Sequence, residues 1–169
     1  ILEEHSFAAE LQAHEVPLAA PWALNIDPQS LHAARLAIRG PTLAAFETAQ
    51  GPYRFAVTAR MAGRAPEVED PSVLEWIGRF IGRIHAVGAT APFRHRLTMD
   101  AATFGTQPRD WLLEQHIVSN DTEGAWRSVT AAALEAVNDA FASWANRRTI
   151  RLHGDCHAGN LLWTEGGPH

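Results

Sequence analysis

One stretch near the carboxyl end of the sequence constrains the fold more than any other. Residues 149–152 (Thr-Ile-Arg-Leu) lead into a polar turn, and residues 161–163 (Leu-Leu-Trp) lead out of it. Between these segments lie one aspartate, Asp155, and one asparagine, Asn160, five positions apart. Short apolar runs bounded by turn residues are typical of buried strands. The stretch therefore predicts two buried strands joined by a loop that presents a carboxylate and a carboxamide.

Phosphoryl transfer uses this pair of side chains. A carboxylate must face the incoming hydroxyl group, and a carboxamide oxygen must face a magnesium ion beside the phosphates. In protein kinases the corresponding loop reads His-Arg-Asp, four residues and Asn. Here His153, Gly154 and Asp155 are followed by four residues and Asn160. Glycine in place of the arginine indicates the aminoglycoside phosphotransferase and choline kinase branch of the kinase-like fold.

The similarity extends beyond these positions. Residues 152–163 resemble the catalytic loop of the bacterial stress response kinase A family, a phosphotransferase-like group of Ser/Thr protein kinases. A bare His-Gly-Asp is a weak signal, but the added asparagine spacing and the apolar flanks make this motif specific. The resemblance covers most of the chain and is weakest at about residues 98–148. Other segments that resemble the family are residues 3–7, 10–11, 16–21 and 78–85, together with Arg94.

The resemblance implies an α+β, protein-kinase-like fold with two lobes. Residues 1–60 would form part of the amino-terminal small lobe, with one helix and antiparallel strands. Residues 61–169 would form a mainly helical carboxyl-terminal lobe that carries the catalytic loop. The chain has no lysine for the nucleotide phosphates and no aspartate after Asp155 for a second metal contact. Because both would lie beyond its ends, we interpret the sequence as an internal fragment and expect little or no activity from it alone.

Phosphoryl transfer suggests a role for each polar residue of the loop. Asp155 would accept or orient the proton of the attacking hydroxyl group. Asn160 would hold Mg²⁺ through its side-chain oxygen, a hard ligand suited to a hard cation. We expect His153 to orient the loop backbone and to pack beneath it. His157 has two open interpretations, contact with the transferring phosphate or support of the turn.

Position within a kinase-like fold suggests a nucleotide-binding segment. Residues 59–64 interrupt the preceding strand pattern, as does the segment that links the two lobes in such folds. Backbone groups of that segment hydrogen-bond the adenine edge of ATP. The acceptor would be the carbonyl of Ala59 and the donor the amide of Met61. The alternative is an ordinary exit from a strand.

The amino-terminal helix offers three acidic residues. Family spacing favours Glu4 as the partner of the phosphate-binding lysine, with a solvated acidic face as an equally weighted alternative. For Glu3 and Glu10 we prefer the solvated face.

Hydrophobic periodicity predicts the other elements. Residues 1–14 read as an amphipathic helix, and a second helix is expected from the Asp70-Pro71 pair to about residue 87. Within the second helix, Gly78 and Gly82 indicate close packing against another helix. Apolar residues at three- and four-residue steps predict a core helix over residues 124–146. Short strands are expected at residues 22–24, 36–38 and 53–58, with a turn at 50–52 and a short helix at 111–113.

Composition narrows the partners and the compartment. The net charge of −5 argues against a general nucleic-acid binder, for which a basic surface is expected. The single cysteine, Cys156, excludes an internal disulfide and fits a reducing cytoplasm. No apolar run approaches the roughly 20 residues of a membrane helix. We therefore expect a cytoplasmic protein without a membrane partner, and the oligomeric state stays open.

The sequence favours an ATP- and Mg²⁺-dependent phosphotransferase, namely a Ser/Thr protein kinase of the stress response type. A small-molecule kinase is the first alternative, because the catalytic loop serves a protein or a small-molecule hydroxyl acceptor equally. A non-catalytic module that binds nucleotide or a partner is the second. A zinc site at His153, Cys156 and His157 is weaker, because no second ligand group appears and Asp155 and Asn160 would go unexplained.

Overall fold

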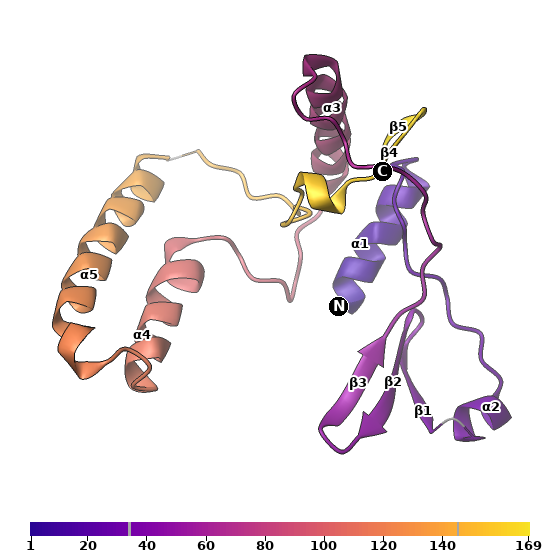
Figure 1. Ribbon diagram of the computed structural model, residues 1–169, viewed down its shortest axis with the longest axis horizontal. Coiled ribbons are helices and arrows are strands. Elements are labelled where there is room, and N and C mark those ends of the chain that lie inside the picture. The colour runs from indigo at the N-terminus through magenta and orange to yellow at the C-terminus, as the bar shows by residue number, and fades with distance from the viewer. Residues whose placement is uncertain (34, 145) are drawn as a thin grey trace. The chain divides into compact units, whose positions relative to one another are not determined.

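The computed structural model describes residues 1–33, 35–144 and 146–169. Contacts divide the chain, drawn in Figure 1, into two compact units. Unit 1 comprises Ile1–Arg94 and Ile150–His169, and unit 2 comprises His95–Thr149. The predicted lobe boundary at residue 60 stays a prediction. Unit 1 joins the first half of the chain to its last 20 residues, so the predicted catalytic loop belongs to the same unit as the amino-terminal helix.

Two helices supply most of the core of unit 1. Helix α1 spans Leu2–Ala13 and helix α3 spans Pro71–Gly88, which confirms both predicted helices. The Asp70 carboxylate caps α3 by accepting a hydrogen bond from the amide of Ser72 at 2.8 Å. A short helix, α2 (Pro28–Ala33), lies between them in the sequence. The buried core residues are Phe7, Leu11, Val16, Phe80, Ile84, Val87 and Leu161.

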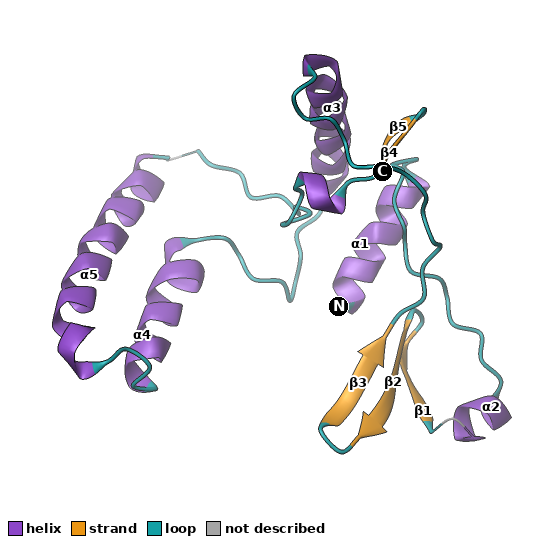
Figure 2. Cartoon of the chain, viewed as in Figure 1, coloured by secondary structure: helices purple, strands orange, loops and turns teal. Residues whose placement is uncertain are grey.

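Three antiparallel strands form a sheet in the order β1-β2-β3 (Figure 2). Their bounds are Leu36–Gly40 for β1, Leu43–Thr48 for β2 and Gly51–Phe55 for β3. The strands predicted at residues 36–38 and 53–58 are therefore found, although β3 ends earlier than expected. The sequence pattern does not reveal β2, because its first three residues are all buried and so lack the alternation that marks a half-exposed strand.

The strand expected at residues 22–24 is absent from the described part of unit 1. Instead, Pro21 forms an isolated bridge with Thr58. The amide of Trp22 donates to the carbonyl of Val57 at 2.8 Å, and the amide of Leu24 donates to a different segment at Pro41, at 2.7 Å. Because successive donors bond to two separate segments, no continuous ladder forms.

Unit 2 is helical. A π-helical turn at Ala102–Thr106 leads into α4 (Gln107–Glu114), which contains the short helix expected at residues 111–113. Helix α5 spans Asn120–Ser143 and confirms the second long helix, although the predicted range also includes Ala145, which lies outside the described residues. The expectation that α5 is a core helix is wrong for this chain. None of its described residues is buried, and Val129 is 68% exposed.

No helix among the described residues is both long enough and apolar enough to cross a membrane. The finding is limited to residues 1–33, 35–144 and 146–169.

The glycines of α3 differ from the prediction. A Cβ atom built at Gly78 or Gly82 meets nothing within 4 Å, so the expected close packing against another helix is wrong. The close approach occurs at the end of the helix instead. A Cβ atom at Gly88 would lie 2.1 Å from the carbonyl oxygen of Arg151, four residues before Asp155. Only glycine therefore fits where α3 meets the segment that leads into the loop.

Replacing Gly88 with alanine is expected to lower the free energy of unfolding of the full-length protein by about 1–3 kcal/mol, because the new methyl group overlaps rigid backbone. Urea unfolding measures the change. Gly78→Ala is the matched control in the same helix. It should be neutral or stabilise by up to about 1 kcal/mol, since it adds helix propensity in open space. Equal effects of the two substitutions would contradict the close approach at Gly88.

Candidate active site

The polar turn forms a compact loop over residues 153–160. Gly154 adopts a φ of 85°, a conformation open to glycine, and so allows the chain to reverse after His153. A single 3₁₀ turn, Ala158–Asn160, closes the loop. Leu161 then enters the core of unit 1 and anchors the loop. A hairpin of β4 (Trp163–Thr164) and β5 (Gly167–Pro168) follows.

The strand expected before the loop, at residues 149–152, does not form. Its backbone is held at one point, where the amide of Arg151 donates to the carbonyl of Gly88 at 3.1 Å. Burial of Arg151, which is 7% exposed, is the part of that prediction that the structure retains. The loop is therefore attached to α3 before it begins and to the core after it ends.

Asp155 and Asn160 contact each other within the loop. The Nδ2 group of Asn160 donates to the carbonyl oxygen of Asp155 at 2.9 Å and to its Oδ2 at 3.0 Å. The side chain of Asp155 is 75% exposed, so the contact orients a carboxylate that a substrate can reach. Because Nδ2 is used inside the loop, the carboxamide oxygen of Asn160 is the end that can face a cation, and its hard character fits Mg²⁺.

The two histidines support the loop backbone. His153 Nδ1 accepts a hydrogen bond from the amide of Asp155 at 3.3 Å. The side chain of His153 is exposed, and its orienting role stays a prediction. His157 Nδ1 accepts from the amide of Gly159 at 3.0 Å and so supports the turn. Its Nε2 lies 3.7 Å from Oδ1 of Asp155, which places the imidazole beside the candidate base.

The segment at residues 59–64 lies against the strand that follows the loop. Arg64 and Trp163 exchange two backbone hydrogen bonds, of 3.0 and 2.8 Å. A Cβ atom at Gly63 would lie 2.8 Å from Cβ of Leu162, so this close approach also requires glycine. The tertiary structure thus brings the predicted nucleotide-binding segment beside the loop, although about 90 residues separate them in the sequence.

A cavity of about 400 Å³ lies between these parts of unit 1, within the range usual for small-molecule sites. Ala59 and Met61 line it together with His153 and Asn160. The carbonyl of Ala59 and the amide of Met61 make no hydrogen bond with any described residue, so both are available to a ligand. The remaining lining is mainly apolar and comprises Leu11, Val16, Leu18, Ala19, Phe80, Ile84, Cys156, Leu161, Leu162 and His169.

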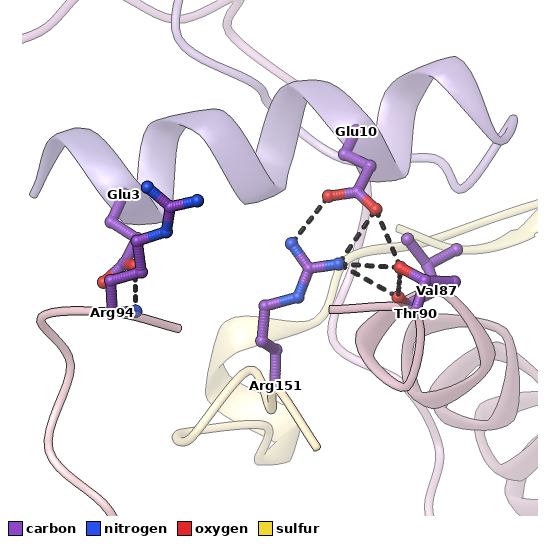
Figure 3. Close-up of polar contacts among 6 residues, drawn as sticks. All are labelled: Glu3, Glu10, Val87, Thr90, Arg94 and Arg151. Atoms are coloured by element: carbon purple, nitrogen blue, oxygen red, sulfur yellow. Dashed lines mark hydrogen bonds and ion pairs between the residues drawn. The ribbon is translucent and has the colours of Figure 1, made fainter. Parts of the chain in front are cut away.

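The acidic residues of α1 differ from one another. Glu4 lies 3.2 Å from the amino group of Ile1 and does not line the cavity; its pairing with a lysine stays a prediction. The solvated face expected for Glu3 and Glu10 is wrong. Glu3 accepts a hydrogen bond from the amide of Arg94, and Glu10 forms an ion pair with buried Arg151 (Figure 3).

One sequence signal pointed to the Glu10 contact. An arginine flanked by apolar residues, as in residues 149–152, needs a counter-charge if the segment is buried, because an unpaired buried charge is very costly. The signal names the arginine, but it does not say which acidic residue pairs with it.

The zinc interpretation gains no support. Among the described residues, no group of three or more His, Cys, Asp or Glu side chains has the arrangement of a metal site. Cys156 instead lines the cavity, where burial raises the pKa of its thiol and the charge of Asp155 adds to the effect.

Comparison with known proteins identifies the class. The phosphotransferase enzyme family matches residues 1–169, and the chain belongs to this family. Stress response kinase A of Salmonella choleraesuis (strain SC-B67) is 36% identical over 166 residues, which make up 98% of this chain and 44% of that protein. Stress response kinase A of Escherichia coli (strain K12) is 36% identical over 167 residues, with the same coverage. A Salmonella typhimurium relative with 36% identity, 98% coverage of this chain and 44% coverage of its own length is named serine/threonine protein kinase RdoA.

These comparisons confirm the resemblance to stress response kinase A. They also confirm the fold class, since a small antiparallel sheet with several helices fits part of the protein-kinase-like fold of this family. The chain spans less than half the length of the relatives named above, at 44%. The activity of the whole protein is therefore a proposal.

Proposed function

We propose that the full-length protein is an ATP- and Mg²⁺-dependent phosphotransferase of the cytoplasm whose acceptor is a serine or threonine hydroxyl group of a protein. The observation that carries the proposal is the shared cavity. Its lining includes Ala59 and Met61, with free backbone groups, and Asn160, which contacts Asp155. A ligand in this cavity can meet an adenine-binding edge at one side and the catalytic loop at the other.

The residues divide the proposed reaction among them. The adenine edge accepts a hydrogen bond from the amide of Met61 and donates one to the carbonyl of Ala59. Asp155 orients the acceptor hydroxyl group and takes its proton while the oxygen attacks the γ-phosphorus atom. The bond between that phosphorus and the bridging oxygen breaks, and ADP leaves. The carboxamide oxygen of Asn160 would hold Mg²⁺, which supplies charge stabilisation for the phosphates.

Phosphate transfer by the full-length protein is the test. With radiolabelled ATP, Mg²⁺ and a generic basic protein acceptor, we expect label on protein Ser or Thr and loss of transfer when EDTA removes the metal. Label that appears only on small hydroxyl compounds would replace the protein acceptor by a small-molecule acceptor. Nucleotide binding without any transfer would contradict the proposal and favour a binding module.

A further inference from the structure

A buried arginine connects the catalytic loop to helix α1. The side chain of Arg151 is 8% exposed, and the residue lies four positions before Asp155. Its Nη1 donates to Oε2 of Glu10 at 2.6 Å, and its Nη2 donates to Oε1 at 2.8 Å (Figure 3). Both oxygens of the Glu10 carboxylate therefore accept hydrogen bonds from the two terminal nitrogens of the planar guanidinium group. This bidentate geometry fixes orientation as well as distance.

The same guanidinium group also contacts the end of α3. Its Nη2 donates to the carbonyl of Val87 at 3.0 Å and lies 3.1 Å from Oγ1 of Thr90. The hydroxyl of Thr90 in turn donates to Oε1 of Glu10 at 3.1 Å. The guanidinium carbon lies 4.4 Å from the ring centroid of Phe7, a cation–π distance. Arg151 therefore joins α1, the end of α3 and the start of the loop at one point.

Stability alone does not explain why a charged pair occupies this position. Taking the charge of Arg151 out of water is costly, and apolar residues of similar volume often stabilise a core as well. What such a pair adds is directional geometry. The loop needs directional support, because the side chain of Asp155 is 75% exposed and its described contacts lie within the loop itself. Its position is therefore set by the backbone on either side.

We propose that Arg151 is a positioning residue that couples the placement of α1 to the placement of Asp155 through its bidentate pair with Glu10. The inference rests on the proposed phosphotransfer for its kinetic test. Its structural test does not depend on that function. A shift of α1 along its axis would move Glu10 away from the guanidinium group of Arg151. The backbone that carries Asp155 would then move with Arg151.

Arg151→Lys is the decisive variant in the full-length protein. Lysine keeps the positive charge but cannot bridge both oxygens of Glu10 and also contact Val87 and Thr90 in one plane. We expect kcat to fall by on the order of 10- to 100-fold, because a misplacement of about 1 Å has effects of this size. The KM for ATP should change much less than kcat, since Arg151 itself does not line the cavity.

A double-mutant cycle tests the coupling. If Arg151 and Glu10 act as a unit, Arg151→Lys and Glu10→Gln together should lower kcat hardly more than either one alone. The matched control is the exposed pair of Arg79 and Glu75 on α3, whose side chains are 72% and 63% exposed. Arg79→Lys and Glu75→Gln should leave kcat unchanged. Additive losses in kcat for Arg151 and Glu10 would overturn the proposal.

Hydrogen exchange provides the readout that is independent of catalysis. In the full-length protein without nucleotide, Glu10→Gln should accelerate amide exchange in peptides covering the loop at residues 153–160, although Glu10 lies 141 positions from Arg151 in the sequence. Arg151→Lys should accelerate exchange in peptides covering α1. The Arg79 and Glu75 variants should change neither region.

The outcomes separate the two claims. Accelerated exchange in both regions supports the coupling even if no phosphotransfer is found, in which case only the proposed function fails. Unchanged exchange in the loop of Glu10→Gln overturns the coupling even if the enzyme is active. If Arg151→Lys does not fold, Glu10→Gln carries both readouts by itself, since it retains the shape of the side chain.

Discussion

Replacement of Asp155 by alanine should lower phosphotransfer by the full-length protein by roughly 1,000-fold, the scale of a lost general base. The carboxylate is oriented by Asn160 at 3.0 Å and stays open to a substrate hydroxyl group. Because the side chain is 75% exposed, its removal creates no cavity and should leave the melting temperature close to that of the wild type. Initial rates of ATP-dependent transfer and a thermal melt on the same preparations measure both effects.

Two further variants sharpen this experiment. Asp155→Asn keeps the shape but removes the negative charge, and it should be nearly as inactive. Asp139→Ala removes an exposed aspartate from α5, which belongs to unit 2 and not to the loop, and should retain full activity. Transfer by Asp155→Ala at more than about a tenth of the wild-type rate would exclude Asp155 as the base.

The largest effect on stability is expected at Glu10. Glu10→Ala leaves the guanidinium group of Arg151 buried without its counter-charge, and loss of one partner of such a pair costs about 3 kcal/mol. Glu10 itself is 34% exposed, so solvent moderates the loss toward the lower end of the usual range. Urea unfolding of the full-length protein measures the difference. Glu75→Ala, from the exposed pair on α3, should cost less than about 1 kcal/mol.

The pH dependence gives a second check on the same pair. The hydrogen bond from Arg151 holds the pKa of Glu10 below its ordinary value of 4.5, and the bond from Thr90 and the charge of Arg151 add to this effect. A carboxyl group whose pKa is lower in the folded state contributes stability above its unfolded pKa, and loses it as the pH falls through the folded pKa. The stability difference between the wild type and Glu10→Ala should therefore be full near neutral pH and shrink below about pH 4.5. A difference that does not change with pH would show that the carboxylate charge contributes nothing.

Local patterns predicted the parts of this chain that local forces decide. The helix from Pro71 to Gly88 begins where Asp70 caps it, and both the cap and the proline are visible in the three consecutive residues 70–72. The loop motif is similar, because Asp155 and Asn160 are only five positions apart and contact each other directly. These features follow from short-range geometry and therefore survive in almost any tertiary context.

Other predictions depended on partners that the sequence does not name. The apolar residues of α5 have the period of a core helix, yet none of its described residues is buried, because burial requires a second surface that covers the helix. The sequence did not predict β2, for the opposite reason. Leu43, Ala44 and Ala45 are buried at successive positions, so the strand shows no alternation of apolar and polar residues there. The hydrophobic period of a segment shows whether its apolar side chains lie on one face of the helix or strand. Whether that face is buried depends on what packs against it.

The amino-acid sequence alone predicted the loop motif of Asp155 and Asn160 and the helix that begins at the Asp70 cap, because each depends on residues within a few positions. Only the tertiary structure could place Ala59 and Met61 around one cavity with Asn160, and could pair Glu10 with Arg151 across 141 positions. A carboxylate on an amphipathic helix looks the same in sequence whether it meets water or a buried arginine. The folded chain decides between them, because an unpaired charge in the core costs more than the ordering of two side chains into one ion pair.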